Sequence, residues 1–246
     1  MANQMGPHPL WLMEALTTVV AVARPMRVLD LGCGRALTSV FLAREFGVDV
    51  WAADLWTDPL DNQARLVEAG VADLVSPVHV EAHELPFGDD FFDLVVSVDA
   101  FHYFGTEDYY LETLLRVVKD GGHVGIVSPG LAYEFGQETP DHLVPFWEWE
   151  YETFHSPTWW RAHWERSGLV AVETADLVPD GWLDWLRWAE VVGPLIAEGW
   201  MREAVLKEAE MLRVDAGQTL GFSRVVARAV TLPGPTSDDA VGRNRH

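Results

Sequence analysis

The most constraining feature of the chain is a strand, turn, helix and strand pattern within residues 28–56, VLDLGCGRALTSVFLAREFGVDVWAADLW. Residues 26–31 and 48–54 are rich in aliphatic and β-branched side chains, and the segment between them has helical periodicity that ends at Gly47. Two strands joined by a helix form a βαβ unit, and parallel strands of this kind are buried on both faces of a sheet. The chain is therefore predicted to be an α/β protein.

The same alternation continues along the chain. Further strands are predicted at 75–81, 91–99, 121–129, 169–177 and 219–230. Helices are predicted from Leu37, with an apolar stripe at Leu37, Val40 and Phe41, from Asp58 to Gly70, and from Thr106 to Lys119; residues 131–167 and 179–213 read as mostly helical. The predicted architecture is a doubly wound, seven-stranded, mostly parallel sheet with an aromatic-rich helical cap inserted among the last strands.

These predictions divide the chain into four parts. Residues 1–25 form an N-terminal helix and a possible lid, and residues 26–130 form the cofactor-binding core. Residues 131–231 form the cap and the last strands, and residues 232–246, rich in Pro, Gly and polar residues, form a frayed tail. The cap would lie over the carboxyl edge of the sheet, where ligands bind in folds of this kind.

Charge and cysteine content narrow the function. The 246 residues carry a formal charge of −21, which repels phosphate backbones and anionic lipid, so nucleic acid and membranes are not expected partners. Cys33 is the only cysteine, so no intramolecular disulfide forms, and the N-terminus lacks the basic start of a signal peptide. A cytoplasmic location is expected, and no metal-ligand spacing is found.

The glycine turn after the first strand predicts a nucleotide cofactor, and the residues around this turn favour one class of cofactor. A dinucleotide-binding GxGxxG pattern requires Gly or Ala at position 37, where this chain has Leu37. Asp30, at the end of the first strand, would repel a pyrophosphate but complements a ligand with an ammonium and a sulfonium group. S-adenosylmethionine is such a ligand. Asp54, at the end of the second strand, suits the ribose of either cofactor.

The segments VLDLGCGRA, VWAADLW, VEAHELPFGDDFFDLVVS and LLRVVKDGGHVGIVSPG together resemble the motif series of class I S-adenosylmethionine-dependent methyltransferases, in their bacterial small-molecule branch. The resemblance covers residues 26–130, with Ala36 where the family has a third glycine. It implies that the methionine part lies at Asp30, Gly32 and Gly34, the ribose at Asp54 and Leu55, the adenine at Glu81, Ala82 and His83, and the sulfonium side at Ser97 and Phe101.

The segment SVDAFHYFG, residues 97–105, leaves the fourth strand where the methyl group of this cofactor should point. We hypothesise that His102 is a general base and that Tyr103 orients the acceptor, with a buried packing role as the alternative for His102. Eight tryptophans of the cap either form its core or line a pocket for a flat acceptor. They are Trp147, Trp149, Trp159, Trp160, Trp164, Trp182, Trp185 and Trp188.

The predicted function is transfer of a methyl group from S-adenosylmethionine, with S-adenosylhomocysteine as product, to O, N or C of a small, hydrophobic or aromatic acceptor. Two alternatives stay open: a protein that binds S-adenosylmethionine without methyl transfer, and an NAD-dependent oxidoreductase. The stretch MGPHPLW before the first helix is a candidate lid over the cofactor. No metal is expected, and a homodimer is left open.

Overall fold

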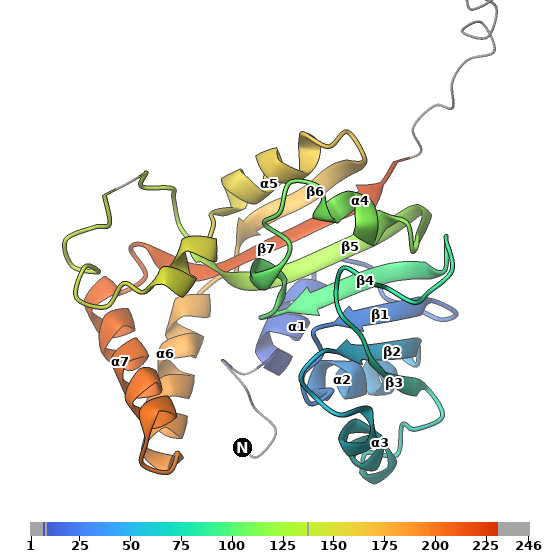
Figure 1. Cartoon of the computed structure of the whole chain (residues 1–246), viewed down its shortest axis with the longest axis horizontal. Helices are drawn as coiled ribbons and strands as arrows, with labels where there is room; N and C mark the ends of the chain where they lie inside the picture. Colours follow the sequence, from blue (N-terminus) through green and yellow to red (C-terminus); the bar gives the residue numbers. More distant parts are fainter. Residues whose placement is uncertain (1–6, 8, 137, 231–246) are drawn as a thin grey trace, which may run out of the picture.

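The computed structural model describes residues 7, 9–136 and 138–230. The predicted tail from residue 232 and residues 5, 6 and 8 of the candidate lid lie outside these described residues. One seven-stranded sheet has the order β3-β2-β1-β4-β5-β7-β6, in which only β7 runs antiparallel to its neighbours (Figure 1). The strands are β1 Arg27–Leu31, β2 Asp49–Asp54, β3 Val75–His79, β4 Phe92–Val98, β5 Val118–Leu131, β6 Val170–Leu177 and β7 Leu220–Ala229. The predicted fold class is confirmed.

Helices cover both faces of the sheet. The helices are α1 Pro9–Thr17, α2 Leu37–Phe46, α3 Pro59–Glu68, α4 Tyr110–Leu115, α5 Pro157–Glu165, α6 Gly181–Val192 and α7 Trp200–Asp215, with short turns η1 Phe101–Tyr103, η2 Trp149–Thr153 and η3 Gly193–Leu195. Helices α1, α2 and α3 lie on one face, and α4 and α5 lie on the other (Figure 1). Helices α6 and α7, inserted between β6 and β7, pack together as a pair beyond the end of β5.

The helix boundaries agree with local capping rules at several places. The Asp58 side chain accepts a hydrogen bond from the Leu60 N–H at 2.8 Å, and Pro59 occupies the first turn of α3. Gly47 closes α2 in a left-handed conformation with φ 65°. These elements form where the sequence predicts them because their stop and start signals are local.

Three predictions about helices differ from the structure. The buried face of α2 is formed by Thr38, Ser39, Leu42 and Ala43, whereas the predicted stripe, residues 37, 40 and 41, lies at its margins. Two hydroxyl side chains are buried there because each donates a hydrogen bond to a buried carboxylate.

The helix predicted from Thr106 to Lys119 begins at Tyr110 and ends at Leu115, and β5 already begins at Val118. A Cβ at Gly105 would lie 2.0 Å from the Phe101 ring, so the chain passes tightly over this ring before the helix begins. The Tyr110 hydroxyl then donates to the Ala82 carbonyl at 3.2 Å, which fixes the start of α4. The long segment 131–167 is also less helical than predicted, with only η2 and α5 assigned in its described part.

Candidate functional site

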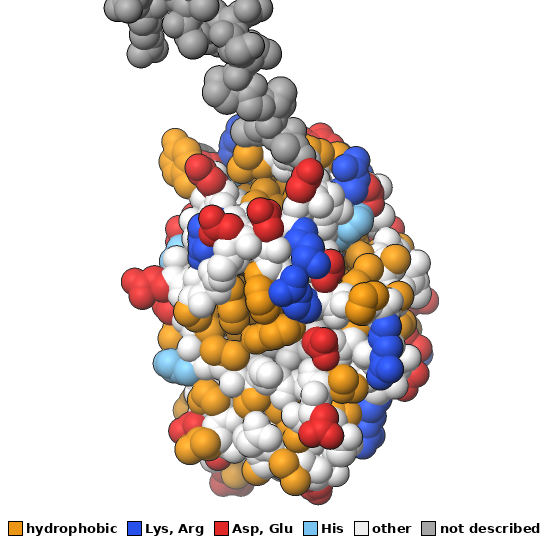
Figure 2. Space-filling model, turned by 90° about the vertical axis from the view of Figure 1, so that its right-hand side faces the viewer, with side chains coloured by type: hydrophobic (Ala, Val, Ile, Leu, Met, Phe, Trp, Pro, Cys, Tyr) orange, Lys and Arg blue, Asp and Glu red, His pale blue; other side chains and the backbone are white. Residues whose placement is uncertain are grey.

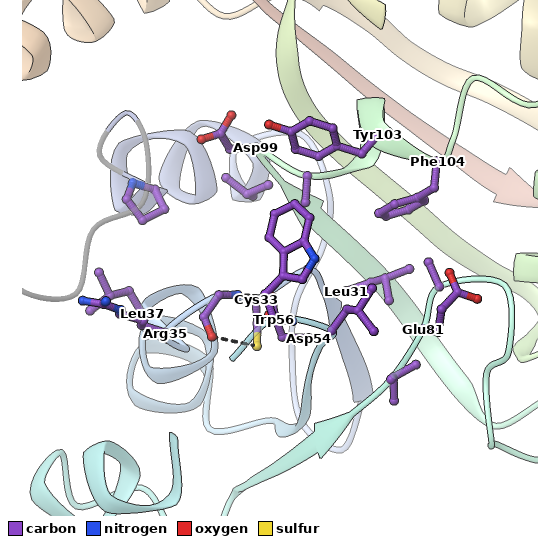
Figure 3. A pocket seen from close by; sticks show the side chains of 18 of the residues that line it. Leu31, Cys33, Arg35, Leu37, Asp54, Trp56, Glu81, Asp99, Tyr103 and Phe104 are labelled. Carbon is purple, nitrogen blue, oxygen red and sulfur yellow. Dashed lines mark hydrogen bonds between the residues drawn. The ribbon is translucent and has the colours of Figure 1, made fainter. Parts of the chain in front are cut away.

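A cavity of about 320 Å³ opens at the carboxyl ends of β1, β2 and β4 (Figure 3). It is lined by residues 31–35 and 37, 54–56, 80–83, 98–100 and 103–104, together with Pro7 and Pro9. Each group of lining residues follows the end of a strand, so the order of the strands in the sheet brings these four segments together. Sequence reasoning placed the site at this edge.

The turn after β1 requires glycine at its first position. Gly32 has φ 76°, and a Cβ there would lie 2.4 Å from the Cβ of Ala100. Gly34 has φ 51°, and the next left-handed residue is Ala36 with φ 59°. Positive φ values cost little only for glycine, and a side chain at position 32 would also overlap Ala100. Both the backbone conformation and the lack of space therefore require glycine there. The missing side chain lets the turn after β1 pack directly against Ala100, which follows β4.

Asp54 joins the first two loops of the site. Its Oδ2 accepts a hydrogen bond from the Gly34 N–H, and its Oδ1 accepts from the N–H groups of Trp56 and Thr57, all at 2.8 Å. The side chain is 8 % exposed and lines the cavity. An ionised carboxylate held by three backbone donors is rigid and still has lone pairs for a ligand hydroxyl.

Asp30 does not line the cavity, which departs from the expectation that it contacts the ligand. The side chain is buried, and its Oδ2 accepts hydrogen bonds from Thr38 Oγ1 and Ser39 Oγ, both at 2.6 Å. Burial, opposed by these hydrogen bonds, raises the pKa of Asp30 to about 6. In this structure Asp30 fastens β1 to the first turn of α2, and the two hydroxyls explain why its carboxyl group turns away from the cavity.

Glu81 and His83 line the end of the cavity beyond β3. Glu81 Oε1 lies 2.8 Å from His83 Nδ1, and Glu81 Oε2 accepts from the His83 backbone N–H at 3.0 Å. The hydrogen bond to His83 lowers the pKa of Glu81, and the same bond raises the pKa of His83, whose Nε2 also lies 3.2 Å from Glu107. The structure therefore gives the His83 side chain a role in orienting Glu81.

Two residues expected at the sulfonium side, Ser97 and Phe101, are fully buried and do not line the cavity. Phe101 packs in an aromatic cluster, with its ring centroid 5.7 Å from that of Trp164. The residues that line this part of the cavity are Val98, Asp99 and Ala100, because the chain turns sharply at Asp99, where φ is 56°.

His102 does not lie in the cavity, so the structure contradicts its placement as a general base in contact with the acceptor. The side chain is 2 % exposed and packs between the rings of Tyr103 and Phe154, at centroid distances of 4.0 and 5.6 Å. Burial lowers the pKa of His102 to about 3, so the imidazole is neutral at physiological pH and a weak proton acceptor. His102 therefore has a buried packing role, which was the alternative to a role as general base.

Tyr103 does line the cavity and is 56 % exposed. Burial of its hydroxyl region, followed by the charges of Asp99, Glu150 and Glu208, raises the pKa of Tyr103 to about 12. The phenol therefore stays protonated at neutral pH and serves as a hydrogen-bond donor or acceptor.

The aromatic wall of the cavity does not come from the cap tryptophans. None of the eight lines the cavity, and Trp160, Trp164, Trp185 and Trp188 are buried in the core. Trp56 and Phe104 line it together with Tyr103, and the rings of Trp56 and Tyr103 lie 5.9 Å apart in an edge-on arrangement. Sequence reasoning missed Trp56, although its place two residues after Asp54 was a usable signal.

Two charged residues of the cavity also went unassigned. Asp99, in the segment 97–105, and Arg35, which follows Gly34, both line the cavity, and the sequence indicates no role for either. Arg35 and Asp99 lie at different sides of the cavity in Figure 3.

In the described part of the chain, no three His, Cys, Asp or Glu residues are grouped so that they could hold a metal ion. No helix of residues 9–136 and 138–230 has the length and apolar character needed to cross a membrane.

Comparison with known proteins agrees with this geometry. Residues 28–122 match a family model described as a methyltransferase domain. The 2-methyl-6-phytyl-1,4-hydroquinone methyltransferase of Synechocystis is 30 % identical over 196 residues, which are 72 % of this chain and 57 % of that protein. The chain spans about half the length or less of the first curated relatives it matches.

Solved structures show the same fold at low identity. A methyltransferase from Geobacter sulfurreducens in complex with S-adenosylhomocysteine superposes with a TM-score of 0.64 at 22 % identity, covering 92 % of this chain and 93 % of that one. The cyclase SpnF superposes with a TM-score of 0.72 at 18 % identity, covering 90 % and 82 %. Residues 28–122 are therefore similar to a methyltransferase domain, and the chain shares the fold of solved methyltransferases.

Proposed function

We propose that the chain binds S-adenosylmethionine in the cavity at the carboxyl edge of the sheet and transfers its methyl group to a small acceptor with an aromatic or heteroaromatic ring. The observation that carries the proposal is the order of groups along the cavity: the Glu81 carboxylate at one end, Asp54 in the middle, and the open turn at Gly32 and Gly34 beyond it. This order suits an adenine, a ribose and an amino-acid chain.

The residues present fit this cofactor. The Glu81 carboxylate, oriented by His83, would accept from the adenine amino group, and Asp54 would accept from the ribose hydroxyls. Gly32 and Gly34 line the cavity with backbone alone, so the methionine chain would lie against this turn, with Arg35 beside it. When bound, S-adenosylmethionine supplies a methyl group on a sulfonium sulfur, which a nucleophile takes by in-line displacement.

The chain's own contribution is positioning. Trp56, Tyr103 and Phe104 form an aromatic wall on the acceptor side, and Trp56 is 72 % exposed, so a flat ligand has a large apolar surface to cover. Holding a nucleophile and a methyl group in line removes much of the entropic barrier of a two-substrate reaction. The buried, weakly basic His102 is not part of this proposal.

Calorimetric titration tests the proposal with S-adenosylmethionine, S-adenosylhomocysteine and NAD. We expect the two sulfur ligands to bind with Kd values of about 1–100 μM and NAD to show no heat of binding. Asp54→Ala should abolish binding of both sulfur ligands because it removes the charge and frees three backbone donors.

An acceptor screen with phenols, indoles and aromatic amines, read out as S-adenosylhomocysteine formation, then separates transfer from binding alone. Binding without any product across the screen would support the alternative of a cofactor-binding protein that transfers no methyl group. Binding of NAD in place of the sulfur ligands would overturn the proposal.

A further inference from the structure

One side chain of the cavity has a geometry that the proposed function does not use. Asp99 follows β4 with φ 56°, and its N–H donates to the Val127 carbonyl at 2.8 Å. Aspartate and asparagine adopt this left-handed backbone more readily than other non-glycine residues, so the turn suits an aspartate at this position. The neighbouring strand β5 holds this backbone in place, and the carboxylate lines the cavity (Figure 3). Among the described residues, no side chain donates a hydrogen bond to it or forms an ion pair with it.

Other elements add negative charge to this corner of the cavity. Glu208 on α7 and Glu150 in η2 both raise the pKa of Tyr103, and Glu208 raises that of Asp99, after the larger effect of burial in each case. Burial raises the pKa of Glu208 itself to about 7, against the hydrogen bond that Trp185 Nε1 donates to it at 3.3 Å. Within the described ranges, no Lys or Arg pairs with any of these three carboxylates.

Aromatic rings surround the same carboxylates. Tyr103 lies at the Asp99 end of the cavity, and behind it the His102 ring packs on Tyr103 and Phe154. The His102 Nδ1 atom is buried without a hydrogen-bond partner among the described residues. Because His102 does not line the cavity, this nitrogen says nothing about a ligand there, whereas the Asp99 carboxylate lines the cavity and is free to pair with a polar ligand group.

We propose that the acceptor binds as a cation: an amine whose protonated nitrogen pairs with the Asp99 carboxylate beside the rings of Tyr103 and Trp56, and whose nitrogen receives the methyl group. Carboxylates combined with aromatic faces are the protein groups that best recognise ammonium ions. The same field of carboxylates disfavours acceptors that carry a carboxylate or a phosphate. This inference rests on the proposed function and narrows its acceptor to arylalkyl and related aromatic amines.

This assignment also determines which group removes a proton from the ammonium nitrogen. An ammonium nitrogen has no lone pair, so it must lose one proton before it attacks, and the Asp99 carboxylate is the group placed to accept it. The nitrogen then gains a bond to the methyl carbon as the bond from that carbon to sulfur breaks, and the sulfur keeps the electron pair. The product leaves as a methylated ammonium ion, and Asp99 returns its proton to solvent.

Ring-matched ligand series test the proposal on protein loaded with S-adenosylhomocysteine. Tryptamine, tryptophol and indole-3-acetate share one ring and differ in side-chain charge, as do phenethylamine, phenethyl alcohol and phenylacetate. We expect the amine of each series to bind about 10-fold or more tightly than the alcohol, and the acid to bind weakest. Equal or tighter binding of the alcohols or acids, or no binding of any member, would overturn the proposal.

The variant Asp99→Asn tests whether the preference for amines over alcohols and acids depends on Asp99. Asparagine tolerates positive φ, so the backbone turn is kept while the charge is lost. We expect amine binding to weaken about 10-fold and N-methylated product to fall at least as much, with binding of S-adenosylmethionine unchanged. Asp73→Asn, an exposed site remote from the cavity, is the matched control for net charge and should change neither.

The two proposals fail in different ways. Loss of S-adenosylmethionine binding in Asp99→Asn would overturn this inference, because Asp99 would then serve the ammonium group of the cofactor. Failure of the parent protein to bind either sulfur ligand would instead overturn the proposed function, and the inference would fall with it.

Discussion

The two halves of the chain use their side chains differently. In residues 26–130, the residues after each strand line one cavity, and short-range hydrogen bonds hold them, as when Asp54 binds Gly34, Trp56 and Thr57. In the described cap residues, 131–136 and 138–230, most of the large aromatic side chains pack against the sheet or against each other, a few such as Trp149 are exposed, and none lines the cavity. Acidic residues of the cap, such as Glu208, influence the site through their charge, which contributes to raising the pKa of Tyr103.

The difference indicates that residues 26–130 organise the cavity and that the described cap residues supply packing and electrostatic character. On the face drawn in Figure 2, acidic side chains lie scattered among apolar groups and several Lys and Arg side chains, and the whole chain carries a net charge of −21. A general negative field concentrates cations near the surface, whereas the unpaired Asp99 provides one defined position for them.

Removing a buried cap tryptophan should have the largest effect on stability and little effect on the cavity. Trp160 on α5 is 0 % exposed and packs on Trp164 and Phe101. We expect Trp160→Ala to lower the free energy of unfolding by about 3–5 kcal/mol, because it leaves a large cavity. Urea denaturation measures this change, and the Kd for S-adenosylhomocysteine of the folded protein should stay the same.

Trp149 provides the control, because it is 83 % exposed and its removal should change the unfolding free energy by less than about 0.5 kcal/mol. A large rise in the Kd for S-adenosylhomocysteine in Trp160→Ala, measured where the variant is fully folded, would contradict the division between the two halves.

A methyl group added at Gly32 should damage the cofactor-binding half directly. The new Cβ would lie 2.4 Å from the Ala100 Cβ, at a residue with φ 76°. We expect Gly32→Ala to weaken binding of S-adenosylhomocysteine by about 100-fold or more, because strain and overlap displace both walls of the cavity. Gly70→Ala separates the two causes, since Gly70 has φ 68° but open space around its Cβ. That control should lose about 1 kcal/mol of stability and no affinity.

Neutralising Asp54 should have a smaller effect on the same cavity. In Asp54→Asn one oxygen still accepts from Trp56 and Thr57, but the new amide group faces the Gly34 N–H, so two donors oppose each other. We expect the Kd for S-adenosylhomocysteine to rise about 10- to 100-fold. Asp58→Asn, four residues away, should be silent, because asparagine caps a helix as well as aspartate does. Equal Kd values for both variants would show that Asp54 does not hold the ligand.

What the sequence predicted correctly depends on local signals. The seven strands, the glycine turn and the caps at Asp58 and Gly47 follow from neighbouring residues, because periodicity and turn chemistry act over a few positions. The same holds for Asp54, whose place at a strand end follows from the strand itself.

What the sequence did not predict depends on contacts between distant residues. Asp30 turns away from the cavity because two hydroxyls on the next helix bind it, which also buries the polar face of α2. His102 is buried because Phe154, from the cap, packs on its ring. Nothing in the local pattern around His102 distinguishes a base in a cavity from a neutral imidazole in a core. The domain boundaries, the lid and the homodimer stay predictions.

The smallest expected effect concerns His83, which adjusts the cofactor end of the cavity through Glu81. The folded-state pKa of His83 is raised, so its contribution to stability is complete below its unfolded pKa and is lost as the pH rises through the folded value. The pKa of Glu81 is lowered, so its contribution is present above its unfolded value and is lost as the pH falls through the folded one. The pair therefore stabilises the fold from mildly acidic to near-neutral pH and not at alkaline pH.

Both side chains are well exposed, so the pair should contribute less than about 1 kcal/mol. His83→Gln should lower the melting temperature slightly at mildly acidic pH, and the difference from the parent protein should shrink as the pH rises. Affinity for S-adenosylhomocysteine should fall about two- to threefold in the same range, because Glu81 loses the partner that orients it. His79→Gln removes a nearby histidine with no ion pair among the described residues and is the control. A melting difference that is constant or grows toward alkaline pH would show that His83 acts by packing on Tyr110, whose ring centroid lies 5.2 Å away, and not through its charge.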